Sequence, residues 1–274
     1  MKFHLLSIPL LFMGILSGTA FADSLEDYSK FKKENYYLLD DQPFSKIECK
    51  IRVPSIDQFL ATVKQQFEAI PGKVVIEENV KDFSLIYTKG QGVSFKKPTF
   101  NIKALEQEKV QNQENFSQGV QKMELGLKDQ IDGVGQVLLG LFDEYTISNK
   151  KKIQEFSRNE TGVEVTTEGI NEKVISREKY SGSSRTSEFT SSTMTGVEQS
   201  KFEKIDNYLV LSESNVQLQL KQSGEIINMI MQIGYDKLNK IVFPKNITSK
   251  TVIQVNVLKQ ETAIDVFLDS CTVE

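Results

Sequence analysis

VQLQLKQSGEIINMIMQIGY, residues 216–235, is the stretch of sequence that decides the fold. Apolar and polar residues alternate on both sides of a glycine-bearing turn, which predicts two half-buried strands in a hairpin. One face of the second strand carries an apolar stripe, made of Ile227, Met229, Met231, Ile233 and Tyr235. The first strand carries a matching stripe, made of Val216, Leu218 and Leu220. Because Ile226 and Ile230 fall on the other face, the sheet is predicted to be buried on one side and partly covered on the other.

The same two-residue period runs through most of the chain after Tyr145. A strand about every ten residues, separated by short turns, is typical of an antiparallel meander. The predicted strands cover residues 151–158, 162–167, 172–180, 185–194, 208–213, 216–221, 225–235, 250–258 and 262–270. The segment 181–200 is rich in Ser and Thr and fits either exposed strands or a mobile loop. Before Tyr145 we expect strands at 45–53, 73–78 and 82–88, an extended piece at 93–102 and a helix at 55–69.

A long helix is predicted from about Glu114 to Tyr145. Apolar residues there step by three or four and fall in an arc about 80° wide. A second file beside this arc consists of glycines spaced seven residues apart, namely Gly119, Gly126, Gly133 and Gly140. Glycine within a helix costs about 1 kcal/mol relative to alanine, so a continuous helix would keep these glycines to let another backbone approach closely. The alternative is a helix broken near residues 133–135.

These elements together predict an α+β protein. The expected architecture is a curved antiparallel β-sheet, similar to a half-barrel, packed with one short and one long α-helix. We expect a signal peptide at residues 1–22, an N-terminal arm at 23–44 that is helical or extended, and a single α+β domain at 45–274.

The N-terminus has the pattern of a secretory signal peptide. Lys2 precedes an apolar run from Leu5 to Leu16, and Ala20-Phe21-Ala22 has the small-x-small form of a cleavage site. The run is short and interrupted for a membrane span of about 20 residues, although an uncleaved anchor is the alternative. Cleavage after Ala22 would place the mature protein in the periplasm or outside the cell.

The composition excludes several classes of chemistry. The only histidine of the chain is His4, so cleavage leaves no histidine for Ser-His-Asp or Cys-His catalysis or for a His-containing metal site. Removing Lys2 changes the net charge from −4 to −5, which argues against nucleic acid as the main partner. We therefore expect no enzymatic activity, no metal and no cofactor.

Two cysteines, Cys49 and Cys271, lie near opposite ends of the mature chain. An even number of cysteines in an exported protein favours a disulfide, which would join the first strand of the sheet to the last. The alternative is two buried free thiols, because sequence alone does not show that the two Cα atoms lie within about 7 Å.

The apolar stripes of the central hairpin are the best candidate for a binding site. With a long helix available to cover it, the sheet could enclose an apolar cavity lined by Leu218, Leu220, Ile227, Met229, Met231 and Ile233. The alternative is a filled core, since most apolar stripes pack against other side chains. The methionines favour an adaptable surface.

The stretch MIMQIGYDKLNKIVFPKNI, residues 229–247, resembles a passage of the periplasmic lipoprotein-carrier superfamily, the LolA/LolB-like proteins. The shared pattern is strand, tyrosine, turn, strand and then apolar-Pro-Lys-x-Ile, and the order of elements extends the likeness over residues 45–270. The resemblance implies a hydrophobic cavity between a half-barrel and helices that holds acyl chains without chemistry. It also implies that Met229, Met231, Leu218 and Leu220 line that cavity.

Three functional hypotheses follow from the sequence. The first is a non-enzymatic carrier or chaperone for an apolar ligand, such as a lipid or the acyl chains of a lipoprotein, with peripheral membrane contact. The second is an envelope-associated structural or protein-interaction module with a filled core and a protein partner. The third is a hydrolase that depends on carboxylates alone, although acidic pairs such as Asp143 and Glu144 are better interpreted as solvated charges.

Overall fold

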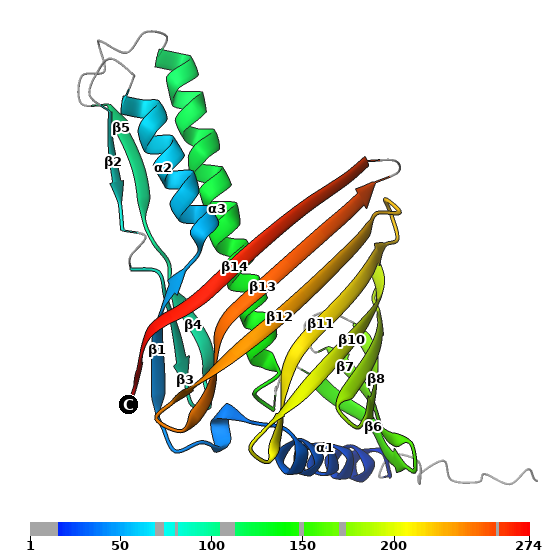
Figure 1. The fold of residues 1–274 in the computed structure, drawn as a ribbon. Coiled ribbons are helices and arrows are strands. Elements are labelled where there is room, and N and C mark those ends of the chain that lie inside the picture. Colours follow the sequence, from blue (N-terminus) through cyan, green and yellow to red (C-terminus); the bar gives the residue numbers. More distant parts are fainter. Residues whose placement is uncertain are drawn as a thin grey trace, which may run out of the picture.

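A long antiparallel sheet dominates the molecule, which we describe from a computed structural model (Figure 1). The structure describes residues 16–68, 74–79, 82–104, 113–147, 151–169, 174–255 and 258–274. The main sheet has 12 strands in the order β4-β3-β1-β14-β13-β12-β11-β10-β9-β8-β7-β6. From β6 to β14 each strand pairs with the next along the chain, so this part is an uninterrupted meander.

The strands have the following bounds. The first group is β1 (Lys46–Arg52), β3 (Ser84–Thr88) and β4 (Gly92–Lys96). The meander is β6 (Lys151–Asn159), β7 (Gly162–Gly169), β8 (Ile175–Ser181), β9 (Ser184–Thr190), β10 (Met194–Ile205), β11 (Tyr208–Leu220), β12 (Ile226–Leu238), β13 (Ile241–Val255) and β14 (Leu258–Val273). A separate two-stranded sheet pairs β2 (Val74–Glu78) with β5 (Phe100–Ala104).

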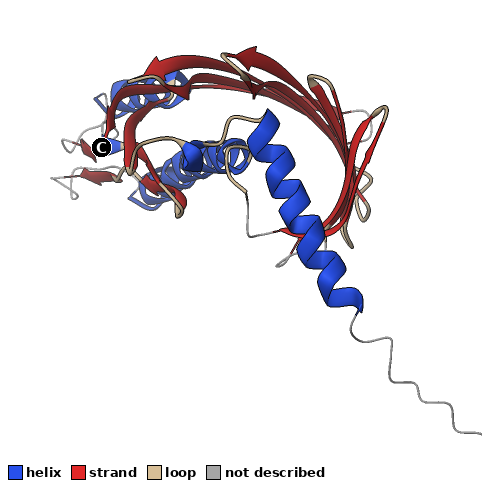
Figure 2. Ribbon diagram, turned by 90° about the horizontal axis from the view of Figure 1, so that it is seen from below, coloured by secondary structure: helices blue, strands red, loops and turns tan. Residues whose placement is uncertain are grey.

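The main sheet curves around the helices without closing (Figure 2). The described helices are α1 (Leu16–Asn35), α2 (Pro54–Glu68) and α3 (Gln113–Asp143), with a 3₁₀ turn η1 (Leu39–Asp41) after α1. We call the face of the sheet toward α1 and α3 the inner face and the opposite face the outer face. The predicted α+β class with a curved antiparallel sheet is confirmed, with α1 as an additional helix.

The core lies on the inner face. It joins buried residues of β1, β3, β12, β13 and β14 to α3, and it includes residues between 31 and 44, namely Phe31, Tyr36, Tyr37, Leu39 and Phe44. The segment that we expected as an arm therefore belongs to the same core as residues 45–274. The first fifteen residues of the expected signal peptide lie outside the described residues, and α1 extends across the expected cleavage position after Ala22.

A disulfide joins the two strands of the main sheet that come first and last in the sequence. β1 lies between β3 and β14, and Cys49 of β1 is bonded to Cys271 of β14. The pairing of these strands shifts register at Cys49, where Ser270 takes a positive φ of 50°. The predicted bond is thus confirmed, and it is compatible with an oxidising compartment.

Helix α3 is continuous, but the expected role of its glycines is not met within the described chain. Around Gly119, Gly126, Gly133 and Gly140, no described atom lies within 4 Å of where a Cβ would stand. No other backbone in the described residues approaches this file of glycines. Gly135, on the other flank of the buried arc, faces the ring of Phe95 in β4 at 4.0 Å. The glycine file is thus turned away from β4.

Candidate functional site: the inner face of the central strands

The register of β11 and β12 places all six predicted ligand-binding residues on the inner face. Leu218 pairs with Ile227, Val216 pairs with Met229, and Ser214 pairs with Met231. Because side chains alternate along a strand, every second residue of β12 from Ile227 to Ile233 shares that face. The predicted grouping of these side chains on one face agrees with the observed pairing.

Burial divides these six residues into two groups. Met231 is 8% exposed and Ile233 is 6% exposed, and both belong to the hydrophobic core. The other four are half-buried, and together with neighbouring Val216 and Ile253 they form what we call the apolar shelf. The apolar shelf therefore consists of Val216, Leu218, Leu220, Ile227, Met229 and Ile253, near the end of the sheet where the β11–β12 turn lies.

The shelf ends at a buried charged cluster on the same face. Arg185 of β9 is 4% exposed and donates from Nη1 to both carboxylate oxygens of Glu144, at 2.8 Å each. Its Nη2 donates to Oε1 of Glu198 at 2.8 Å and to Oγ of Ser200 at 3.1 Å. Lys32 of α1 adds a second cation, whose Nζ lies 3.9 Å from Glu144. The cluster thus ties β9 and β10 to the end of α3 and to α1.

Electrostatics keep this cluster charged in the interior. Burial lowers the pKa of the Arg185 guanidinium, but the carboxylates of Glu144 and Glu198 outweigh burial and hold that pKa well above its usual value. Nearby, Tyr180 donates from its hydroxyl to Glu178 at 2.5 Å, and burial raises the pKa of Tyr180. These interactions tie the cluster together in the interior.

A small cavity lies beside the cluster. A cavity of about 30 Å³ is bordered by Tyr28, Lys32, Glu144 and Arg185, which is room for about one water molecule. The Nε atom of Arg185 is buried and has no hydrogen-bond partner among the described residues. One water in this hole would satisfy it.

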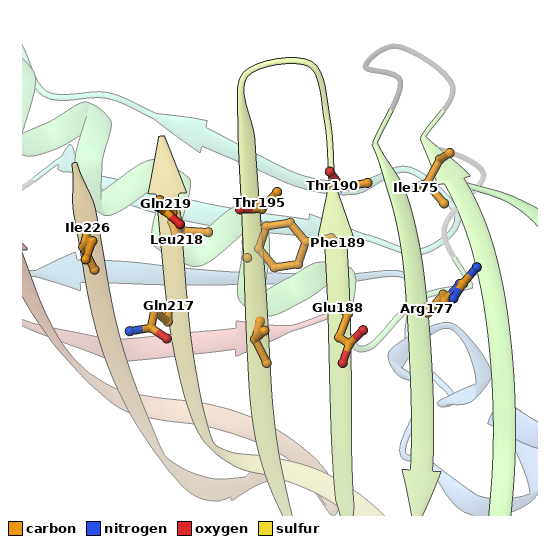
Figure 3. Close-up of a pocket in the computed structure, with 12 residues that line it drawn as sticks. Ile175, Arg177, Glu188, Phe189, Thr190, Thr195, Gln217, Leu218, Gln219 and Ile226 are labelled. Carbon is orange, nitrogen blue, oxygen red and sulfur yellow. The ribbon is translucent and has the colours of Figure 1, made fainter. Parts of the chain in front are cut away.

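Larger hollows lie elsewhere on the described surface. One of them, about 620 Å³, spans β8 to β12 (Figure 3). A cleft of about 550 Å³ lies between α2, β1 and β14, with Ile56, Leu60 and Phe83 in its apolar lining. A third, about 340 Å³, lies between α3 and β4. Of the six predicted ligand residues, Leu218 alone borders any of these hollows.

Sequence reasoning missed the charged cluster and the hollow that spans β8 to β12. Glu144, Arg185 and Glu198 come from three separate elements, and no local spacing relates them. The hollow spans segment 181–200, which had been left open as strands or loop. One local pattern in this segment could have indicated a strand. Glu188 and Thr190 lie on one face of β9 and Phe189 lies on the other.

Two further features that can define a function are a metal site and a membrane-spanning helix. Within the described residues, no group of three or more His, Cys, Asp or Glu side chains is placed to hold a metal ion. No helix in that part of the chain is long and apolar enough to cross a membrane. The chain matches no protein-family model, no curated protein and no solved structure.

Proposed function

We propose that the protein is an exported, non-enzymatic binding protein that holds an apolar ligand on the apolar shelf. The ligand class is a lipid or the acyl chains of a lipoprotein. The single observation that carries this proposal is that the shelf residues, on the concave side of a curved sheet, are only half-buried. A filled core would have buried them as fully as Met231 and Ile233.

Simple energetics support an apolar occupant. An acyl chain that covers about 200 Å² of apolar shelf gains about 5 kcal/mol, at about 25 cal/mol per Å². Methionine adapts its shape to different partners, and Met229 lies in the middle of the shelf. The ligand would therefore lie on the open inner face of β11 and β12.

The family resemblance of residues 229–247 supports the same ligand class. A carrier of acyl chains would combine a curved sheet with helices on its concave side, and the molecule has both. Within this proposal the protein works in the periplasm after cleavage at Ala22. Contact with the membrane surface would be peripheral, during loading or release of the ligand.

A second candidate is an envelope-associated module that binds another protein. The observation in its favour is the close packing beneath α1, where the cavity holds only about 30 Å³. In that case the shelf would be covered by a partner protein. A pull-down that yields one stoichiometric protein and no lipid would favour this candidate.

The test uses two neighbouring residues on opposite faces of β12. Met229→Gln changes an inner-face side chain to a polar one of similar volume, and Ile230→Gln places the same group on the outer face. We expect the unaltered protein to bind a fluorescent fatty acid, M229Q to bind it about fivefold to tenfold more weakly, and I230Q to bind it normally.

Two results would remove the proposal. One is the absence of fatty-acid binding by the unaltered protein together with no lipid in native mass spectra of protein purified from its source. The other is equal binding by M229Q and I230Q. Thermal unfolding of both variants shows that each retains the fold.

A further inference from the structure

The outer face of the meander carries apolar side chains that nothing in the described chain covers. Ile175 is 44% exposed, Val197 is 38% exposed and Ile230 is 40% exposed, and they stand on β8, β10 and β12. These are three of the eight large apolar residues with high exposure in the described chain. Ile175 and Val197 line one hollow together with the half-buried Ile226, and apolar side chains gathered in this way are typical of an interaction surface.

The same area is hollowed. Phe189, Gly196 and Leu218 are register partners on β9, β10 and β11, and all three line a hollow of about 620 Å³. The rim comes from outer-face side chains of the neighbouring strands (Figure 3). Around the helices, however, the outer face is convex (Figure 2). The surface is therefore saddle-shaped, as twisted sheets are.

A saddle has a particular geometric property. Turned over by a twofold rotation, it fits against a copy of itself, because the concave direction of one copy meets the convex direction of the other. A dome has no such fit. Twofold contacts of this kind, in which one patch meets the same patch, are the commonest in homo-oligomers.

The charges in the hollow are also self-complementary. Arg177 of β8 and Glu188 of β9 are register partners on the outer face, and both are exposed. Neither forms an ion pair with another residue in the part of the chain that the structure describes. In a twofold contact each Arg177 would meet a Glu188 of the other copy, and each Glu188 an Arg177.

We propose that the outer face of β8–β12 is a self-association surface that seats a second copy of this chain. Five strands spaced about 4.8 Å apart and six residues long cover about 480 Å² per copy, or about 1,000 Å² in all. That area is at the lower limit for a specific interface, so the dimer is weak, with a Kd in the micromolar range or above. The contact uses the face opposite the apolar shelf and does not depend on the proposed ligand.

Charge reversal tests the contact. The variants Arg177→Glu and Glu188→Arg each place like charges opposite one another, so each dimerises at least about tenfold more weakly. Mixed in equal amounts, they restore both attractive pairs, and heterodimers form. Lys122→Glu, a reversal on the exposed surface of α3, serves as control and leaves the dimer unchanged. Sedimentation velocity from about 1 to about 500 μM measures the unaltered chain, the three variants and the mixture.

Three results would overturn the proposal. The unaltered chain could remain monomeric throughout the concentration range. The dimer could persist unchanged in both charge-reversal variants, which would place the contact elsewhere. The equimolar mixture could remain as weak as its components, which would show that Arg177 and Glu188 do not face each other. Circular dichroism of each variant confirms its fold before mixing.

Discussion

Arg185 places a full positive charge inside the molecule, and its surroundings explain how the fold tolerates it. Two carboxylates share its guanidinium, and Glu198 also accepts hydrogen bonds from Ser200 and Ser214 at 2.8 Å and 2.9 Å. The serines on neighbouring strands are small enough to leave space for the long side chain. Such a buried pair is costly to break, because each partner left behind is a charge in a poorly solvated place.

We therefore expect Arg185→Met to lower the free energy of unfolding by about 3 to 5 kcal/mol. Arg177→Met, on the exposed outer face of the adjacent strand, is the matched control and should change it by no more than about 0.5 kcal/mol. Urea denaturation of both variants at low protein concentration measures the difference. Equal stabilities of the two variants would show that the cluster does not hold β9 to α3.

At the residue scale, the sequence predicted which side chains share a strand face. It did not predict ion pairs between residues that are far apart in the sequence. The two-residue period was enough to place Met229 and Met231 on one face of β12. The partnership of Arg185 with Glu144 joins positions 41 residues apart, and only the assembled fold creates it. The disulfide could be predicted because two cysteines can form only one pair within the chain.

At the element scale, α3 contains a file of glycines that no other described part of the chain contacts. Each glycine lowers helix stability by about 1 kcal/mol relative to alanine. A Cβ at Gly126 would meet no described atom within 4 Å. Stability alone therefore favours alanine at this position.

Gly126→Ala should raise the free energy of unfolding by about 1 kcal/mol. Gly196→Ala is the contrasting variant, because a Cβ there would collide with the ring of Phe189 and with Leu218. We expect it to lower stability by about 1 to 3 kcal/mol. Thermal and urea unfolding measure both. A destabilised G126A would mean that some part of the protein packs against this flank of α3.

Among the elements, the helices and most strands were predictable and two strands of the meander were not. β10 was missed because its inner-face positions include Gly196, Glu198 and Ser200, which give no apolar alternation. The first half of β13 was missed because Pro244 interrupts it. The structure accommodates this proline at an irregularity of the β12–β13 pairing, where the lost backbone hydrogen bond matters least.

At the scale of the whole molecule, the interior is rich in tyrosine. Burial is the main cause of a raised pKa at seven tyrosines, namely Tyr28, Tyr36, Tyr37, Tyr87, Tyr145, Tyr180 and Tyr235. At Tyr37 the pKa is raised to about 12. An unfolded tyrosine has a pKa of about 10, so the unfolded chain releases these protons at lower pH than the folded chain.

Stability is therefore expected to be fully present below about pH 10 and to fall steeply as the pH rises above it. Because the folded state resists ionisation, most tyrosines should ionise together with unfolding. Tyrosinate absorbance and circular dichroism, followed in parallel from neutral to alkaline pH, check this. Separate transitions, with most tyrosines ionised while the sheet is intact, would contradict the buried positions of these rings.

The central claim, that an apolar ligand lies on the inner face of β11 and β12, is tested most directly by locating the ligand. A photoreactive fatty acid is bound to the full chain, activated by light and mapped by peptide mass spectrometry. The account predicts labels on the apolar shelf, at residues that border none of the described hollows, such as Ile227, Met229 and Ile253. Labels on the outer-face hollow around Val197 or in the cleft beside Leu60, or no label at all, would contradict it.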